Sequence, residues 1–514
     1  AARNAALDQA TREWVLVLDG DETCVIDSPT ELASALQQTK WDGFSLSVSS
    51  LNDNGTYSKG TVFRLFRRER SGMRYRGAIH EQLETVSDRK GSTSTLSCIR
   101  LEHDGYTAAV IAGQDKVNRN IRLASKVKQD RPSDPFSWFV YAMAIAPSDP
   151  DGMLEAAQTA FELLDAVPAH VRGDYYVVYL YLAVISVHQS RGNMRQVIEM
   201  ADRALAMFPD SPDLHYQRGG ARIVTGDVSG AVEDFQVALS EAASAFQLII
   251  DSAAVGFGAR MGLGRALRVL GRGDEALVSL RIAAAQAPAG YADAHAELAE
   301  LLMERGALDE AVPLFEEAHR RSPTASGIAF KLGWCLYKLE QVDKAEAFLG
   351  GQTADPQAEL LLARILLETG RAQQALTRLA ANALPAALIT VGWCQFVLGH
   401  SEAAERAWDA WLAQTPDTNT SKAALVLFRC LMGDATSAVV GPLPGGEAPR
   451  EMDAWVLLLL RYQQTEQVDQ IIRHGLRLGG PAWIDVRMRW AQAMVMGGFV
   501  EAGMALLFDA ARDT

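Results

Sequence analysis

The sequence contains few cysteines and no long apolar run. Its 514 residues include five cysteines, an odd number, and no two of them form a Cys-x-x-Cys pair. This scarcity argues against a disulfide framework and a zinc site, and it fits a reducing compartment such as the cytosol. No stretch of about 18 uninterrupted apolar residues occurs, so we expect no transmembrane helix. The start lacks a secretory signal and an initiator methionine, so we expect a fragment or a processed chain.

Positive charge is also scarce in the later part of the chain. Residues 1–132 hold 19 Lys and Arg against 17 Asp and Glu, whereas the remainder holds 30 against 46. The formal net charge of the whole chain is −14 at pH 7. An acidic surface repels nucleic acid and anionic lipid. The composition therefore favours a basic or neutral peptide as the partner of the later part.

Glycine, in contrast, recurs at regular steps in that later part. The recurring glycines are Gly192, Gly226, Gly271, Gly306, Gly370 and Gly399. The step is 34 residues from Gly192 to Gly226 and 35 residues from Gly271 to Gly306. An alanine stands five residues after each of these glycines except Gly192, which is followed there by Val197. Internal periods of this length predict stacked helical hairpins.

Each of these residue types has a physical role in a helical hairpin. The recurring glycines are expected to end the first helix in a left-handed conformation, which other residues resist. Small residues let the two antiparallel helices approach closely, and these are the alanines together with Gly219, Gly264, Gly333 and Gly392. Proline ends the second helix because it cannot continue one. Such prolines occur at Pro209, Pro288, Pro323 and Pro416.

The spacing resembles the tetratricopeptide repeat, strongly over residues 173–416, while residues 133–172 and 417–514 resemble degenerate repeats. We therefore expect an all-α solenoid over residues 133–514, preceded by a helical linker over 111–132. A solenoid of this kind binds a protein or peptide through its concave face, although a spacer or dimerisation arm is the alternative. Cys335 and Cys394 sit at equivalent repeat positions, each after Gly-Trp, and are expected to pack in the core.

The first 110 residues lack this period. The continuous apolar run from Trp14 to Leu18 is typical of a buried, parallel-type strand. It is followed directly by Asp19 and Asp21 around a glycine. In open α/β sheets, ligands bind beyond the carboxyl ends of strands, so the two carboxylates could hold Mg²⁺ or Mn²⁺ against substrate phosphates.

These residues resemble the middle of a family 2 glycosyltransferase of GT-A fold. The resemblance rests on Ala2-Arg3-Asn4, Leu18-Asp19-Gly20-Asp21-Glu22, Val62 to Arg68, Tyr75 to Glu81, His103, Gly105-Tyr106 and Arg119-Asn120. It covers residues 1 to about 135 and is similar to the subgroup in which the transferase runs into tetratricopeptide repeats. The section that holds the nucleotide base and ribose in the family precedes Ala-Arg-Asn and is not in this sequence. The expected fold class is therefore α+β, a partial GT-A domain over residues 1–110 followed by the solenoid.

The resemblance implies roles for particular residues. Asp19 and Asp21 would be the Asp-x-Asp pair that binds the metal and the diphosphate, with Asp21 the main ligand. Glu81 would be the general base that deprotonates the acceptor, and His80 a structural neighbour. His103 would be either a third metal ligand or a structural histidine; both remain open.

Two functions follow as hypotheses. The first is an inverting, metal-dependent glycosyltransferase that uses a nucleotide-sugar donor, with Mn²⁺ or Mg²⁺ as cofactor and a protein or peptide acceptor on the solenoid. The chain as given would lack activity if the nucleotide-binding half is missing. The alternative is a non-catalytic binding scaffold that the transferase remnant caps.

Overall fold

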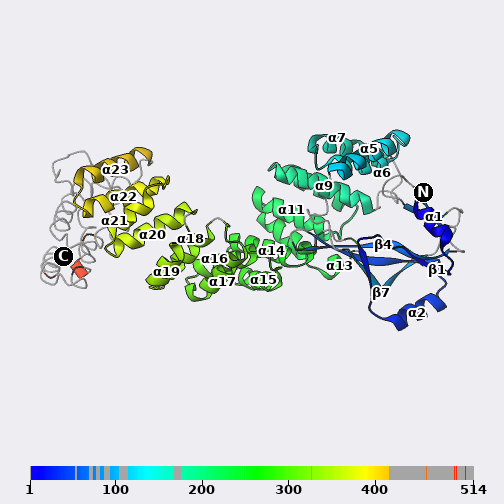
Figure 1. Cartoon of the computed structure of the whole chain (residues 1–514), viewed down its shortest axis with the longest axis horizontal. Helices are drawn as coiled ribbons and strands as arrows, with labels where there is room; N and C mark the ends of the chain where they lie inside the picture. The colour runs from blue at the N-terminus through cyan, green and yellow to red at the C-terminus, as the bar shows by residue number, and fades with distance from the viewer. Residues whose placement is uncertain are drawn as a thin grey trace. The chain divides into compact units, whose positions relative to one another are not determined.

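The structure is a computed structural model. It describes residues 2–52, 55–68, 73–76, 82–85, 93–103, 114–166, 175–244, 251–325, 327–352 and 354–415, with isolated positions elsewhere. By their contacts the residues divide into two compact units. The first unit comprises residues 1–306 with 320–322, and the second comprises residues 307–319 with 323–514 (Figure 1). This division falls inside the helical part, and the boundaries expected from the sequence near residues 110–132 stay a prediction.

The first unit begins with strands. They are β1 (Trp14–Leu16), β2 (Glu22–Ile26), β3 (Gly43–Leu51), β4 (Tyr57–Arg67), β5 (Met73–Arg76), β6 (Gln82–Thr85) and β7 (Thr93–His103). Five of them form one sheet in the order β1-β4-β3-β7-β2, and β5 pairs with β6 separately. Only the β3–β7 pair of the five-stranded sheet is parallel.

Two short helices contribute to the cores on the faces of this sheet. Helix α2 (Pro29–Gln38) contributes Leu32 and Leu36 to a cluster with Phe44 and Leu46. Helix α1 (Ala2–Gln9) contributes Leu7 to a second cluster. Each cluster buries apolar surface that would otherwise contact water, so the sheet is stabilised from both sides.

The apolar run from Trp14 to Leu18 differs from its prediction. In the described part of the chain it forms an edge strand, paired antiparallel with β4, and not a buried parallel strand. Trp14 packs in the cluster of α2 and Val15 in the cluster of α1. Residues Trp14 to Val17 are apolar because both faces are covered, which does not depend on strand direction, whereas Leu18 is exposed.

Helices make up nearly all of the described chain after residue 113. In chain order they are α5 (Gln114–Asp130), α6 (Pro135–Ile145), α7 (Pro150–Asp165), α9 (Tyr175–Ser190), α10 (Met194–Leu205), α11 (Pro212–Thr225), α12 (Val228–Ala238), α13 (Glu241–Ser244), the 3-10 helix η1 (Ser252–Val255), α14 (Phe257–Val269), α15 (Gly273–Gln286), α16 (Asp293–Glu304), α17 (Leu308–Arg321), α18 (Ile328–Lys338), α19 (Val342–Leu349), α20 (Pro356–Glu368), α21 (Ala372–Leu379), α22 (Pro385–Val397) and α23 (Ser401–Gln414). Hairpins pair α11 with α12, α14 with α15, α18 with α19, α20 with α21 and α22 with α23. The expected helical solenoid is thus confirmed for the described residues; Pro416 and nearly all of 417–514 lie outside them.

The turn inside each hairpin follows the predicted backbone conformation. All six recurring glycines have positive φ, between 73° and 91°. The glycine series skips one repeat, and Glu340 occupies that turn position with a φ of 60°. Among the described residues, Glu340 is the one non-glycine residue with positive φ. The repeat therefore imposes the left-handed turn even where the sequence does not supply a glycine.

Close contact between the two helices of a hairpin uses a fixed offset of 16 residues. A Cβ placed on Gly219 would lie 3.0 Å from Phe235 Cζ, and one on Gly264 would lie 2.6 Å from Leu280 Cγ. The same offset joins Gly333 to Leu349 and Gly392 to Trp408. The alanines after the turn, Ala231, Ala276, Ala311, Ala375 and Ala404, are fully buried. At these positions glycine and alanine let the two helices of a hairpin approach closely, as the sequence predicted.

One buried carboxylate ties three helices of the first unit together. The side chain of Asp234, on α12, is 2% exposed. Its oxygens accept hydrogen bonds from three residues of α11: His215 at 2.8 Å, Arg218 at 2.6 Å and Arg222 at 2.9 Å. Arg218 also donates to Asp202 on α10, at 2.5 Å. The charge of Asp234 is therefore paired inside the helix stack, as a buried charge must be.

Candidate functional site

The two acidic residues that follow β1 have different partners. Asp19 accepts from Arg3 Nη2 at 2.6 Å through Oδ1 and from Arg64 Nη2 at 2.8 Å through Oδ2. Arg64 also donates to Glu22, at 2.9 Å. Burial by itself would lower the pKa of Arg64, but its hydrogen bond to Asp19 and the charges of Asp19 and Glu22 outweigh burial and raise that pKa. Both carboxylate oxygens of Asp19 are thus engaged by guanidinium groups.

Asp21 instead meets His103. The antiparallel pairing of β2 with β7 places Glu22 opposite His103, which brings the preceding residue, Asp21, close to the imidazole. Asp21 Oδ2 lies 3.2 Å from His103 Nε2, and the Asp21 side chain is 60% exposed. The sheet thus brings together two of the three predicted metal ligands. Among the described residues, no cluster of three or more His, Cys, Asp or Glu side chains could hold a metal.

The predicted general base, Glu81, and its neighbour His80 lie outside the described residues, between β5 and β6. The predicted general-base role of Glu81, and the metal roles of Asp19, Asp21 and His103, therefore stay predictions.

A second candidate surface is formed by the first helices of successive hairpins. Within each unit these helices contact one another directly, α11 with α14, α14 with α16, α18 with α20 and α20 with α22. Arg265 on α14 donates to Glu297 on α16 at 2.8 Å, and Tyr337 on α18 donates to Glu368 on α20. We call the side of each unit that these helices present the first-helix face.

One repeat position on this face differs in exposure from helix to helix. It lies six residues before the turn residue and is occupied by Gly220 in α11, where an added Cβ would meet no atom within 4 Å. The equivalent residues in the other first helices are Ser186 in α9, Arg265 in α14, Glu300 in α16, Trp334 in α18, Arg364 in α20 and the buried Trp393 in α22. Lys338 Nζ lies 5.7 Å from the centroid of the half-buried Trp334 ring. Sequence reasoning missed this position, although counting backward from each turn residue would have found it.

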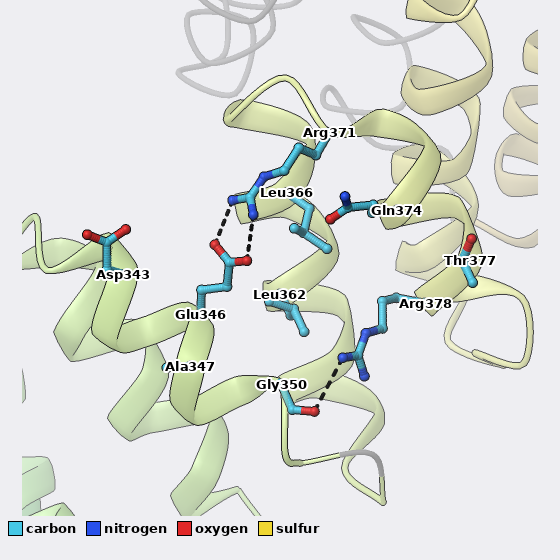
Figure 2. Close-up of a pocket in the computed structure, with 10 residues that line it drawn as sticks. All are labelled: Asp343, Glu346, Ala347, Gly350, Leu362, Leu366, Arg371, Gln374, Thr377 and Arg378. Carbon is cyan, nitrogen blue, oxygen red and sulfur yellow. Dashed lines mark hydrogen bonds and ion pairs between the residues drawn. The ribbon is translucent and has the colours of Figure 1, made fainter.

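A third feature is a cleft on the other side of the second unit, between α19 and α21 (Figure 2). Its volume is about 710 Å³. One wall comes from α19, the floor from α20, and the other wall from α21 with the residue before it. No local sequence pattern indicates this cleft, because it depends on how far neighbouring hairpins stand apart.

The buried cysteines of the repeats are packing residues, as predicted. Cys335 and Cys394 have no exposed surface. Burial raises the pKa of Cys335 to about 11 and that of Cys394 to about 12. Both thiols therefore stay protonated near neutral pH, and a protonated thiol is a poor nucleophile.

Comparisons with known proteins match the helical part. Family models described as tetratricopeptide repeat match residues 186–247, 261–326 and 302–358. A TPR repeat-containing protein of Synechococcus elongatus is 36% identical over 84 residues, which are 16% of this chain and 20% of that protein. This chain thus matches about a fifth of that relative's length.

Solved structures with a similar helical arrangement share little sequence with the chain. PilF of Pseudomonas aeruginosa is 17% identical, with 47% of this chain and 93% of that chain covered and a TM-score of 0.34. The C-terminal part of a TPR repeat-containing protein from Cytophaga hutchinsonii is 15% identical, with coverage of 47% and 98% and a TM-score of 0.37. YrrB, described as a TPR protein with an unusual peptide-binding site, is 21% identical, with coverage of 32% and 88% and a TM-score of 0.26.

In the described part of the chain, no helix is long and apolar enough to cross a membrane. The turn glycines from Gly192 to Gly306 fall within the residues that the family models match, and so do the 16-residue contacts from Gly219 to Leu349. The chain therefore carries tetratricopeptide repeats over residues 186–247 and 261–358.

Proposed function

We propose that the repeats form a protein-binding scaffold that holds a peptide segment of a partner against the first-helix face. The observation that carries this proposal is the pair Trp334 and Arg364, which occupy equivalent repeat positions on α18 and α20 of the second unit. Because α18 and α20 contact each other, these two positions provide a shared surface in the second unit for an extended or helical segment. Partly exposed tryptophan and arginine are the residues that most often dominate binding energy at protein interfaces.

In the second unit, the charge of the first-helix face favours a partner whose bound segment is acidic. The sequence predicted a basic or neutral partner, because the solenoid as a whole is acidic. On α18 and α20, however, the charged residues include Lys331, Lys338 and Arg364, while Glu359 is buried against Arg378. Glu368 is hydrogen-bonded by Tyr337. The cations beside Trp334 would therefore attract carboxylates of the partner.

A charge-scanned peptide array on the full chain tests this function. We expect retention of peptides that combine Asp or Glu with an apolar or aromatic residue. Trp334→Ala should weaken their binding at least about tenfold, the effect of losing an aromatic anchor. Arg406→Ala, at a 73% exposed arginine on α23, is the matched control and should leave binding unchanged. Peptides that bind equally well to the Trp334 variant, with an unchanged circular dichroism spectrum, would contradict the proposal.

The N-terminal region supports a second candidate function, a metal-dependent inverting glycosyltransferase with a nucleotide-sugar donor. The observation in its favour is the pair Asp21 and His103, 3.2 Å apart. An exposed carboxylate beside an imidazole fits Mn²⁺, or Mg²⁺ through the carboxylate, if donor phosphates and water complete the coordination. When bound, the metal would neutralise the charge of the donor diphosphate. Asp19, held by Arg3 and Arg64, would orient the loop, and Glu81 would accept the proton of the acceptor.

Direct metal titration separates this candidate from the scaffold. We expect Mn²⁺ to bind the full chain, and Asp21→Ala and His103→Ala each to weaken that binding at least about tenfold, because each removes one of two protein ligands. Asp8→Ala is the control, since Asp8 is an exposed carboxylate on α1 that pairs with Arg74. Equal Mn²⁺ affinity in all four proteins would exclude a metal at this pair.

If a nucleotide-sugar donor and an acceptor are found, Glu81→Gln should reduce turnover by about 10²–10⁴-fold, the usual contribution of a positioned base. Donor affinity should change little, since the base contacts the acceptor. Turnover within a few-fold of wild type would remove Glu81 from the mechanism.

A further inference from the structure

The cleft between α19 and α21 has two walls of opposite charge. Asp343 and Glu346 stand on the α19 wall, and Arg371 and Arg378 stand on the other. The floor consists of Leu362 and Leu366 of α20, which are buried and apolar. Gln374 and Thr377 add polar groups to the basic wall (Figure 2).

Two arginine bridges cross the cleft. Arg371 and Glu346 form a bidentate ion pair, with both N–O distances at 2.6 Å. Arg378 donates to the carbonyl oxygen of Gly350 at 3.3 Å and to Glu359 at 3.2 Å. Figure 2 shows these bridges at opposite ends, with Leu362 and Leu366 between them. The side chains of Glu346 and Arg371 are 30% and 34% exposed, so water and solutes can reach the ion pair.

We propose that this cleft binds a short peptide in zwitterionic form with an apolar side chain. Its four ionisable lining residues, Asp343, Glu346, Arg371 and Arg378, have no net charge together. An anion or a cation alone would pair with one wall and leave the charges of the opposite wall without their present partner, which offsets part of the gain in binding free energy. A ligand that carries an ammonium and a carboxylate gives each wall a new partner.

Each part of such a ligand has a partner among the lining residues. The ligand ammonium pairs with Asp343 and Glu346, and the ligand carboxylate with Arg371 and Arg378. The apolar side chain packs on Leu362, Leu366 and Ala347. Arg371 offers two parallel N–H donors that match a carboxylate, so the ligand can replace Glu346 there without loss of geometry. The volume of about 710 Å³ lies within the range of small-molecule pockets.

This proposal goes beyond the scaffold function, because the walls of the cleft come from the second helices α19 and α21. Its floor residues, Leu362 and Leu366, lie on the opposite side of α20 from Arg364, since successive residues turn by about 100° around a helix. Loss of partner binding in the Trp334 variant and loss of dipeptide binding are therefore separate results.

The ligand-side test uses calorimetry on the full chain with leucyl-leucine. Ligand efficiency for molecules of this size predicts a Kd of about 0.2 mM. N-acetyl-leucyl-leucine and leucyl-leucine amide each keep one charge and should bind at least about tenfold more weakly, because one wall loses its ion pair. Leucine alone tests whether the single amino acid is the better ligand. Absence of leucyl-leucine binding, or equal affinity of N-acetyl-leucyl-leucine amide, in which both ends are blocked, would overturn the proposal.

The protein-side test uses Arg371→Gln and Glu346→Gln. Arg371→Gln should weaken leucyl-leucine at least about tenfold while leaving leucyl-leucine amide, which lacks the carboxylate, nearly unchanged. Glu346→Gln should act in the opposite sense, weakening the amide form and sparing the acetylated one. This crossed pattern would not arise from a structural defect, which would weaken every ligand alike. Arg406→Gln on α23 is the control, and equal effects on all ligands would refute the assigned orientation.

Discussion

The backbone is locally strained at Glu340, because this residue has a Cβ and adopts the left-handed conformation of the repeat turn. At the equivalent position six other hairpins have glycine, which adopts positive φ without a steric penalty. A residue with a Cβ in this conformation costs roughly 1–2 kcal/mol. The side chain of Glu340 is exposed, so no burial offsets that cost.

Glu340→Gly should therefore stabilise the chain. Relief of strain, reduced by the greater freedom of glycine in the unfolded chain, leaves a gain of about 0.5–1 kcal/mol. Urea denaturation followed by circular dichroism measures it as a higher midpoint. Glu340→Ala, which keeps the Cβ, is the control and should give no such gain; a gain equal to that of glycine would mean that the strain is not backbone strain.

A pair of glycines with different surroundings tests the close helix contact. A Cβ at Gly392 would overlap the ring of Trp408, which is 1% exposed and has little room to move. Gly392→Ala should destabilise the second unit by about 1–3 kcal/mol, the cost of overpacking.

The matched control is Gly220→Ala, in a helix interior where the added Cβ meets open space. Alanine is the better helix former, so this change should raise stability by up to about 1 kcal/mol. Thermal and urea midpoints of both variants decide the matter. If both variants changed stability in the same direction, helix propensity, and not the contact with Trp408, would explain the effect of Gly392→Ala.

At the scale of elements, Asp234 holds α10, α11 and α12 together. Burial alone would raise the pKa of Asp234, but the hydrogen bonds from His215 and Arg218, with the charges of Arg218 and Arg222, lower it below its ordinary value of 3.8. Because the folded pKa lies below the unfolded one, the ionised carboxylate stabilises the fold above about pH 3.8. That contribution is lost as the pH falls through the folded pKa.

Asp234→Asn should destabilise the first unit by about 3 kcal/mol at pH 7, because two arginines and a histidine lose their common anion. The difference between wild type and variant should shrink as the pH falls below about 3.8, because the Asp234 carboxylate takes up a proton in the unfolded chain before it does so in the folded one. Thermal melts between pH 3 and pH 7 measure this difference. A difference that stays constant with pH would show that Asp234 acts by packing and not by charge.

At the scale of the whole molecule, the acidic balance sets the pH of lowest solubility. The pI of the sequence is about 5.2, and net charge near zero promotes association. Asp234 remains ionised at that pH, so its contribution to the fold should persist. We expect precipitation near pH 5.2 that reverses at pH 7 with the original circular dichroism spectrum. A precipitate that redissolves with altered helix content would show that acid unfolds the chain before it becomes neutral.

The sequence predicted the parts of the fold that depend on local chemistry. Gly226 and Gly392 could be assigned to a turn and to a close contact because each role admits almost no other residue. The strand that pairs with β1, and whether it pairs in parallel or antiparallel, could not be predicted. A strand covered on both faces is apolar in either orientation. The Asp-Pro starts of α6, α7 and α20 were available as helix signals and were overlooked.

The candidate site was predictable only where residues lie close in the chain. Asp19 and Asp21 follow a strand, and that pattern is visible in the sequence. The arginines that engage Asp19 are Arg3 and Arg64, the latter 45 residues away, and only the sheet brings that one near. The cleft of α19 and α21 likewise depends on the spacing of hairpins, which no local pattern encodes.

The 16-residue offset between the small and the large residue has a consequence for how such a chain changes in evolution. Both members of each pair lie in one hairpin, so a whole hairpin can be duplicated or deleted without separating a glycine from its partner. A single residue inserted between the members within a helix would turn the large side chain by about 100° around the helix axis. Chain length should therefore vary among descendants by complete hairpins, while Gly392 and Trp408 stay the same number of residues apart.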